Sequence, residues 1–341
     1  MFDNNNSKPS RLRAEVLLAK DLRKFYGPRE ALRGLSFSLK AGRILGFLGP
    51  NGAGKTTAIR ILTTILEPDS GHFVVDGISS EYPEKIRHKI GVLPESLGFH
   101  KQMTGLECLT FFGRLYGRSA SEAKENGQSL LKDVGLDQRA KSLVGSYSRG
   151  MRQRLGIARA LVNEPAVVFL DEPTLGLDPR GQQELLALVR WIARERNAGV
   201  VLCSHLLAEV ESVCDDVVIL SSGQIAASGT VTEVIGQTQS HKGGIMQSRK
   251  AGSIRIQVPS SSVAEAQQIL RTAPNVMQVT STSEIGGWLR VELADSGNGS
   301  LEEHNVKNKI LGALIRADIP VLSFEAEGGR LQDVFLQLTE K

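Results

Sequence analysis

The stretch GPNGAGKTT, residues 49–57, decides the fold of this chain. It satisfies the pattern G-x-x-x-x-G-K-[ST], and it follows the apolar run RILGFL, which is typical of a buried strand. The residues after it, TAIRIL, have the spacing of a helix. In such a strand, turn and helix start, consecutive backbone N–H groups face an anion beside the positive end of the helix dipole. The stretch therefore predicts a phosphate-binding loop.

Two side chains of this loop have specific expected tasks. Lys55 is expected to reach the β- and γ-phosphates of a nucleotide, and the Thr56 hydroxyl is expected to bind Mg²⁺. ATP and Mg²⁺ are therefore the expected cofactors. The other residues expected to contact the nucleotide here are Gly49, Pro50, Asn51, Gly52, Ala53, Gly54 and Thr57. The following helix is expected to run through TTAIRILTTIL, as far as the turn residues at 68–71.

An acidic pair in AVVFLDEPTLGLDP, residues 166–179, is the second anchor. Four apolar residues end in Asp171 and Glu172, and the carboxyl end of a buried strand is where α/β sheets bind ligands. Asp171 is expected to hold Mg²⁺ through water, and Glu172 to polarise an attacking water. Taken alone, such a pair is more typical of a helix start, but the phosphate loop favours the catalytic interpretation.

Length and composition narrow the class of protein. The 341 residues favour two domains, and 41% apolar with 23% charged residues is typical of a folded chain. The net charge is only +4 and no strongly basic run is present, so no nucleic-acid partner is expected. Cys108, Cys203 and Cys214 lack paired spacing, which favours reduced thiols. The polar amino terminus lacks a signal-peptide core, and the apolar runs are far shorter than the ~20 residues that span a bilayer.

The order of patterns along the chain suggests a tail, a large domain, a linker and a small domain. Residues 1–14 are expected to form a disordered tail, and strand and helix signals then alternate as in an α/β sheet. Two helical patterns between 104 and 144 indicate a helical insertion. A polar linker is expected at 237–252. At 253–341 the pattern is strand, helix, strand, strand, helix, strand and a last helix, the order of a ferredoxin-like α+β domain.

With these motifs in this order, the chain resembles ATP-binding-cassette (ABC) ATPases over roughly residues 15–235. The resemblance implies an α/β P-loop NTPase of ABC type at 15–236. It further implies a mostly parallel core sheet, an N-terminal antiparallel β part and a helical subdomain at about 96–150. The small α+β domain at 253–341 would be an accessory domain, either dimerising and stabilising or binding a regulatory ligand.

The resemblance assigns roles to residues outside the two anchors. YSRGM occupies the place of the family's signature L-S-G-G-Q, so Ser148 and Gly150 would complete the ATP site of a second copy. Tyr26 would stack on adenine, Asp178 would lie in a loop crossing the dimer interface, and His205 would contact the γ-phosphate. Two simpler interpretations stay open. Tyr26 can be a half-buried aromatic residue of a strand, and His205 can be a capping or core histidine.

The chain departs from the family pattern at two places. Glu95 stands where the family usually has Gln, and its carboxylate can still reach a water bound to Mg²⁺ or can slow hydrolysis by its charge. In the signature, Tyr147, Arg149 and Met151 replace Leu, Gly and Gln. The Arg149 side chain can add positive charge to the site or point to solvent.

Within the family, the chain resembles the ATP-binding subunits of bacterial ABC-2 type exporters, the group with drug-resistance and sodium-efflux systems. This implies a homodimer that closes head to tail on ATP and drives a separate integral-membrane permease. The helical insertion and the loop at Glu95 would dock on that permease, at the cytoplasmic face of a bacterial membrane. The alternative is a non-transport ABC ATPase of translation or DNA repair, but such proteins carry two cassettes or a long coiled coil, and neither pattern is seen.

Overall fold

The computed structural model describes residues 14–237, 253–281, 287–293, 299–327 and 330–339. The chain divides into two compact units, Met1–Val231 with Leu338–Lys341, and Thr232–Gln337. The expected tail at 1–14 and linker at 237–252 lie, except for residues 14 and 237, outside the described residues.

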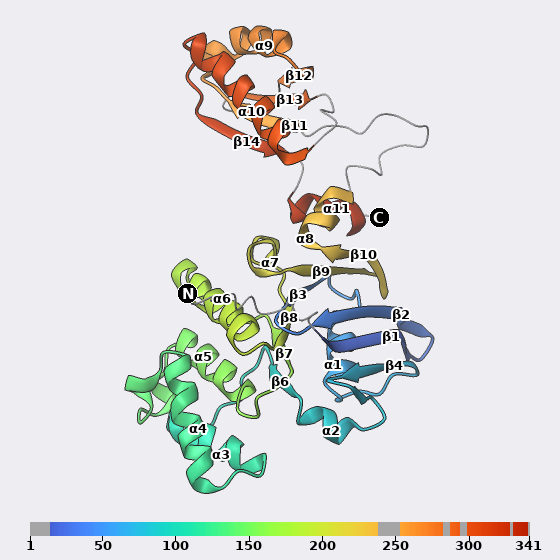
Figure 1. Ribbon diagram of the computed structural model, residues 1–341, viewed down its shortest axis with the longest axis vertical. Helices are drawn as coiled ribbons and strands as arrows, with labels where there is room; N and C mark the ends of the chain where they lie inside the picture. Colours follow the sequence, from blue (N-terminus) through green and yellow to red (C-terminus); the bar gives the residue numbers. More distant parts are fainter. Residues whose placement is uncertain (1–13, 238–252, 282–286, 294–298, 328–329, 340–341) are drawn as a thin grey trace, which may run out of the picture. The chain divides into compact units, whose positions relative to one another are not determined.

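The first unit contains two sheets and the helices that cover them (Figure 1). An antiparallel sheet has the strand order β2-β1-β4-β5. Its strands are β1 (Glu15–Tyr26), β2 (Arg29–Lys40), β4 (Ser70–Val75) and β5 (Ile78–Ser79). A six-stranded sheet has the order β10-β9-β3-β8-β7-β6, parallel except for β10. Its strands are β3 (Ile44–Leu48), β6 (Ile90–Leu93), β7 (Val167–Asp171), β8 (Gly199–Cys203), β9 (Asp216–Ser221) and β10 (Gln224–Thr230).

The six-stranded sheet separates two hydrophobic cores, because successive side chains of a strand point to opposite faces. On one face, Phe47 and Phe169 pack with the antiparallel sheet and with helix α1 (Lys55–Leu62). On the other face, Val168 and Leu170 pack with the helices that follow β6 and β7. The near-continuous apolar runs of β3, β7 and β8 are buried for this reason.

The remaining helices of the first unit follow the capping signals of the sequence. Helices α3 and α4 each begin with a capping box, Thr104 with Glu107 and Ser119 with Glu122, which confirms the two predicted helical patterns. Figure 1 shows α3, α4 and α5 grouped on one side of the unit. The helices are α2 (Pro83–Arg87), α3 (Gly105–Leu115), α4 (Ala120–Asp133), α5 (Arg149–Ala160), α6 (Pro179–Glu195) and α7 (Leu207–Val213), with 3₁₀ turns η1 (Asp137–Arg139) and η2 (Val144–Ser146).

The helix after the phosphate loop is shorter than predicted. Helix α1 (Lys55–Leu62) ends six residues before Pro68. The Thr63 hydroxyl donates to the Ile59 carbonyl at 2.7 Å, and Thr64 has a left-handed φ of 61°. The helical spacing of the following residues was therefore misleading, because the backbone turns away at Thr64.

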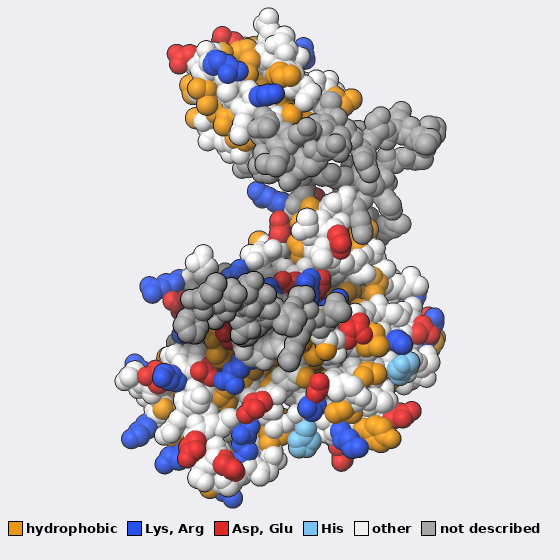
Figure 2. Space-filling model, in the orientation of Figure 1, with side chains coloured by type: hydrophobic (Ala, Val, Ile, Leu, Met, Phe, Trp, Pro, Cys, Tyr) orange, Lys and Arg blue, Asp and Glu red, His pale blue; other side chains and the backbone are white. Residues whose placement is uncertain are grey.

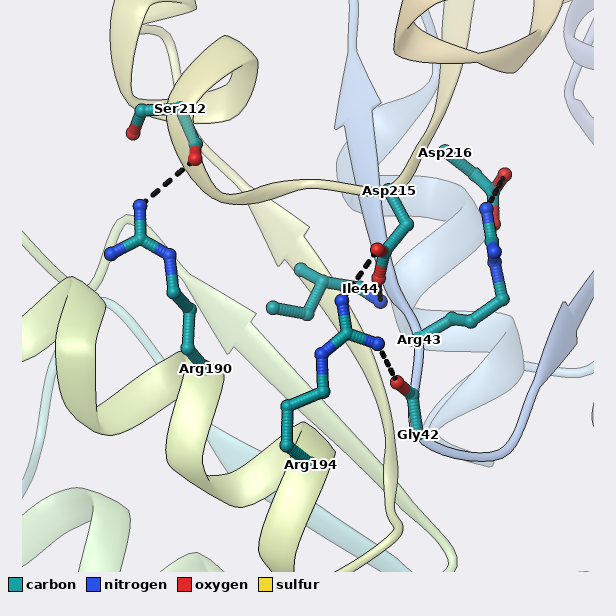
Figure 3. Close-up of polar contacts among 8 residues, drawn as sticks. All are labelled: Gly42, Arg43, Ile44, Arg190, Arg194, Ser212, Asp215 and Asp216. Atoms are coloured by element: carbon teal, nitrogen blue, oxygen red, sulfur yellow. Dashed lines mark hydrogen bonds and ion pairs between the residues drawn. The ribbon is translucent and has the colours of Figure 1, made fainter. Parts of the chain in front are cut away.

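A polar cluster joins β3, β9 and α6 at the amino ends of the parallel strands (Figure 3). Asp216 receives two hydrogen bonds of 2.5 Å from the Arg43 guanidinium. Asp215 accepts from the Ile44 backbone N–H at 2.9 Å and from Arg194, in the last turn of α6, at 2.6 Å. Ligands bind α/β sheets at the opposite edge, so this cluster fixes the scaffold rather than the site.

The second unit contains a four-stranded sheet of order β12-β13-β11-β14, in which all neighbouring strands are antiparallel. Helices α9 and α10 bury Leu270 and Ile310 against Ile256 and Val291 of the sheet. The elements follow the predicted order of this part of the chain. They are β11 (Ser253–Gln257), α9 (Val263–Thr272), β12 (Val276–Ser281), β13 (Trp288–Leu293), α10 (Gly299–Arg316), β14 (Ser323–Glu327) and α11 (Leu331–Thr339), with a 3₁₀ turn η4 (Ser260–Ser262) before α9. A further helix, α8 (Val231–Gln237), precedes this part of the chain.

The surface of the first unit mixes both signs of charge. On the face drawn in Figure 2, basic and acidic side chains alternate with apolar and neutral ones. No helix within the described ranges is long and apolar enough to span a bilayer. The three cysteines carry free thiols, and burial raises the pKa of Cys108 to about 11.

We propose that residues 253–341 form a domain of their own, and predict that this fragment folds alone. The reason is that the described members of one hydrophobic cluster of the second unit, which span residues 254–324, all lie within this fragment. Expressed separately, the fragment should show a cooperative thermal transition by circular dichroism. A melt without a transition would contradict the proposed domain boundary, and the intact chain is the control.

Candidate functional site

The phosphate loop connects the carboxyl end of β3 to the first turn of α1. Gly54 precedes the helix with φ 106°, and a Cβ at this position would lie 2.7 Å from the Ala31 carbonyl oxygen. Gly49 is restricted in the same way, since a Cβ there would lie 2.6 Å from the Leu220 oxygen. No described side chain caps the first N–H groups of α1. These N–H groups are therefore available to an anion, and glycine is the residue that fits the loop.

Lys55 folds back over its own loop. Its ammonium donates to the backbone carbonyls of Gly49 and, at 3.1 Å, of Pro50. Burial lowers the pKa of Lys55, and the negative charges of Glu172 and Asp171 oppose this shift. The structure thus brings the predicted lysine and the predicted acidic pair into one electrostatic site.

The acidic pair lies where β7 ends. Asp171 is the last residue of the strand, and Glu172 has a left-handed φ of 48° while its N–H donates to the Cys203 carbonyl of β8 at 2.9 Å. Burial raises the pKa of Asp171, and the negative charges of Glu172 and Glu95 raise it further. Three carboxylates therefore share one region, together with Lys55.

His205 contacts the acidic pair directly. Its Nδ1 lies 2.8 Å from Glu172 Oε2, and the two side chains are 58% and 19% exposed, respectively. His205 follows β8 by two residues, and Asp171 pairs with Cys203 in the parallel register of β7 and β8. The reading of His205 as a core histidine is wrong, because the imidazole is exposed and bonded to the predicted catalytic carboxylate.

The donor set fits a magnesium ion that also binds nucleotide phosphates. Among the described residues, no three His, Cys, Asp or Glu side chains cluster as a metal site by themselves. Mg²⁺ usually takes one or two carboxylates, with phosphates and water completing its shell. Asp171 and Glu95 repel one another here, and a divalent cation would relieve that repulsion.

Tyr26 lies at the end of β1 and is 48% exposed. Its partner across the β1–β2 turn is Arg29, whose Nη2 lies 3.4 Å from the Gly52 carbonyl oxygen of the phosphate loop. The hairpin end is therefore beside the loop, as a base-stacking role for Tyr26 requires. Arg29 was not among the predicted site residues. The available signal was a basic residue three positions after Tyr26.

The signature segment, residues 147–151, lies on the face of the six-stranded sheet opposite to α1. Ser148 caps α5, its hydroxyl accepting from the Met151 N–H at 3.2 Å. Residues of α5 belong to one core and residues of α1 to the other. Within the described chain, no hydrogen bond or ion pair connects Ser148 or Gly150 to residues 49–57.

Two of the three signature residues that depart from the family pattern pack in the hydrophobic core. Tyr147 is 3% exposed, and its hydroxyl donates to the Arg139 carbonyl at 2.7 Å. A Cβ at Gly105 would lie only 2.4 Å from this hydroxyl, so the start of α3 closes over the ring. Met151 packs against the same hydrophobic core. These two side chains pack α5 against the helical part of the first unit.

The third residue that departs from the signature pattern, Arg149, lies against the loop that follows Glu172. A Cβ at Gly176 would lie 2.6 Å from the Arg149 guanidinium carbon, and Gly176 has φ 71°. Arg149 is exposed yet it does not extend freely into solvent. Beside it, a Cβ at Gly150 would lie 3.7 Å from Leu177. The signature and residues 172–178 of the same chain are therefore in contact.

Asp178 caps helix α6. Its carboxylate accepts from the Gly181 N–H at 2.8 Å, and Pro179 occupies the first helical position. The residue is exposed and ends the loop that begins at Glu172. Its local task is to cap the start of α6.

Comparison with known proteins identifies relatives along most of the chain. The family model described as "ABC transporter" matches residues 32–175. The linearmycin resistance ATP-binding protein LnrL of Bacillus subtilis strain 168 is 32% identical over 95% of this chain and 98% of its own. The daunorubicin/doxorubicin resistance ATP-binding protein DrrA of Streptomyces peucetius is 32% identical over 98% of this chain and 94% of its own.

Solved structures confirm the predicted ABC-type α/β fold. An ATP-binding subunit of an ABC transporter matches with a TM-score of 0.60 and 31% identity, over 67% of this chain and 95% of that one. A dimeric bacterial ABC transporter cassette matches with a TM-score of 0.57 and 25% identity, over 63% of this chain and 98% of that one. With the phosphate loop, acidic pair and histidine assembled at one sheet edge, the chain belongs to the ATP-binding subunits of ABC transporters, which are ATPases.

Proposed function

We propose that this chain is the ATP-hydrolysing subunit of an ABC exporter, acting as a head-to-tail homodimer beneath a separate membrane permease. The observation that carries the proposal is the contact of His205 with Glu172 beside Lys55 and Asp171. Export is supported by relatives that span nearly the whole chain and confer resistance to linearmycin or to daunorubicin and doxorubicin. Translation and DNA-repair roles are not favoured, since these relatives are resistance proteins.

ATP would bind with its phosphates on the loop at 49–57. The free N–H groups at the start of α1 would hold the phosphates, and Lys55 would exchange the Gly49 and Pro50 carbonyls for phosphate oxygens. Tyr26, next to the loop through Arg29, would stack on the adenine ring.

Hydrolysis would need a base for the attacking water. Glu172 would be this base, and two observations support the role: its carboxylate is partly buried, and His205 contacts its Oε2. His205 would orient this carboxylate through Nδ1; donating to the γ-phosphate from Nε2 as well requires both ring nitrogens to carry a proton. Mg²⁺, when bound through Thr56, Asp171 and Glu95, would neutralise charge on the phosphate oxygens.

The second subunit would complete each site through its signature. Ser148 and Gly150 stand at the start of α5, on the face opposite to α1 of their own chain. A closed dimer can bring them to the partner's nucleotide, and a cassette of similar structure is dimeric. Asp178, exposed at the end of the adjacent loop, would lie at the same interface.

The helical insertion offers the docking surface for the permease. A hollow of about 510 Å³ opens beside α3 and α4, and Phe111 in it is 51% exposed. The lining combines apolar side chains with three cations and one carboxylate. Its residues are Thr104, Leu106, Glu107, Thr110, Phe111, Arg114, Lys124 and Lys141.

Arg159 connects this insertion to the loop after Glu95. From α5, the guanidinium donates to the Leu97 carbonyl at 2.8 Å and lies 4.8 Å from the Phe99 ring and 5.4 Å from the Phe112 ring of α3. A movement of α3 caused by a permease would therefore be transmitted through Arg159 to the loop after Glu95 and to the signature helix α5. On this proposal the chain is peripheral, at the cytoplasmic face of the membrane.

Replacing Glu172 by Gln tests the base. The amide keeps the size of the side chain but cannot take the proton, so kcat for ATP hydrolysis should fall at least about a hundredfold. ATP affinity by calorimetry should change little, and the ATP-bound dimer should accumulate in size-exclusion chromatography. Lys55→Ala is the control that loses nucleotide binding. Turnover by Glu172→Gln at the wild-type rate would exclude this carboxylate as the base.

Replacing Ser148 tests the shared site. Ser148→Arg places a bulky cation at the interface, while Ser148→Asp keeps a good helix cap and adds negative charge toward the phosphate. Both should lower ATP hydrolysis by about tenfold or more, the loss of one charge-assisted contact, without weakening ATP binding to the monomer. Ser146→Arg, on an exposed residue just upstream, is the matched control. Hydrolysis unchanged in both Ser148 variants would contradict the head-to-tail arrangement.

A further inference from the structure

A buried carboxylate, that of Glu209, connects the loop that follows Glu172 with the residue that precedes His205. Glu209, in α7, is 8% exposed, and its Oε2 accepts hydrogen bonds from two hydroxyls. Thr174 donates to it at 2.7 Å and Ser204 at 3.1 Å. The two hydroxyl residues are 0% and 1% exposed. One carboxylate oxygen thus holds two side chains that are 30 residues apart in the sequence.

Each hydroxyl residue is close in sequence to a proposed catalytic group. Thr174 comes two residues after Glu172, and Ser204 comes directly before His205. Ser204 also accepts from the Leu206 N–H at 3.1 Å, so its hydroxyl spans the turn that contains His205. The loops after β7 and β8 are therefore joined at two places, by the contact of Glu172 with His205 and by the hydrogen bonds of Glu209.

The two carboxylate oxygens of Glu209 have different surroundings. Oε2 has its two hydroxyl donors, while Oε1 is buried and has no hydrogen-bond partner among the described residues. Oε2 is therefore the atom through which Glu209 connects the two loops.

We propose that Glu209 is a positioning residue for ATP hydrolysis, which sets the loop of Glu172 against the loop of His205 through Thr174 and Ser204. The inference rests on the proposed roles of Glu172 and His205. Glu209 touches neither the nucleotide site nor Lys55 through any contact given by the described residues. Its loss should therefore disturb hydrolysis and leave ATP binding intact.

The test compares variants of the 341-residue chain by kcat, ATP affinity and melting temperature. Glu209→Leu, which removes both acceptor oxygens at similar size, should lower kcat by about a hundredfold, the scale for a misplacement of about 1 Å. The dissociation constant for ATP should stay within about twofold, because the phosphate contacts of the loop are unchanged. Glu209→Gln should recover part of the rate, since its amide oxygen can still accept from both hydroxyls.

Thr174→Val and Ser204→Ala remove the donors one at a time with little change of shape. Each should lower kcat, and either one combined with Glu209→Leu should cost less than the sum of the single effects, because the same bond is removed twice. These two variants carry the test if Glu209→Leu does not fold.

Val213→Ala is the matched control, since Val213 is a buried apolar residue of the same helix. It should lower the melting temperature without lowering kcat. Two results would overturn the positioning role. One is a wild-type kcat in all the variants of Glu209, Thr174 and Ser204, and the other is a loss of kcat in Val213→Ala as large as in those variants. Loss of kcat in Glu172→Gln alongside unchanged Glu209 variants would reject only this inference, whereas full activity of Glu172→Gln would reject the proposed function.

Discussion

The parallel register of β3, β8 and β7 is the constraint on which the proposed site depends. Because these strands run the same way and are neighbours in the sheet, their carboxyl ends meet at one edge. The phosphate loop follows β3, His205 follows β8 and the acidic pair ends β7. A shift of β7 by one residue would turn Asp171 to the other face of the sheet. The ion pairs of Asp215 and Asp216 help hold β3 and β9 at the far edge.

The site balances one lysine against several carboxylates. Burial disfavours the charge on Lys55 and on Asp171 alike, and each group partly compensates the other. Glu172 and Glu95 leave an excess of negative charge near Asp171. A divalent cation and a polyphosphate together fit such an arrangement, because the cation meets the carboxylates while Lys55 and the α1 backbone meet the phosphates.

The unusual signature is explained by packing in this chain. Tyr147 takes the place of an apolar core residue and pairs its hydroxyl with the Arg139 carbonyl. Arg149 rests on Gly176, so the signature and the loop after Glu172 are in contact within one subunit. In the proposed dimer these two segments would serve different nucleotides. Their contact would give each site a direct connection to the other.

Much of the site was predictable because its motifs are short and local. The spacing of Gly49, Gly54 and Lys55 follows from the geometry of a strand, a turn and a helix, and the acidic pair follows from a buried strand of four residues. Caps such as Thr104 with Glu107 are likewise local signals. The end of α1 was predicted too late in the chain, because the residue types around the left-handed turn at Thr64 do not mark such a turn.

The sequence by itself determined the family, the phosphate loop and the acidic pair, since each is encoded within a few consecutive residues. Only the tertiary structure decided that His205 meets Glu172, that Arg29 lies beside Gly52 and that Arg149 covers Gly176. It also decided that Glu209 holds Thr174 and Ser204 together. These pairs come from segments far apart in the chain, and hydrophobic packing around the central sheet is what brings them into contact.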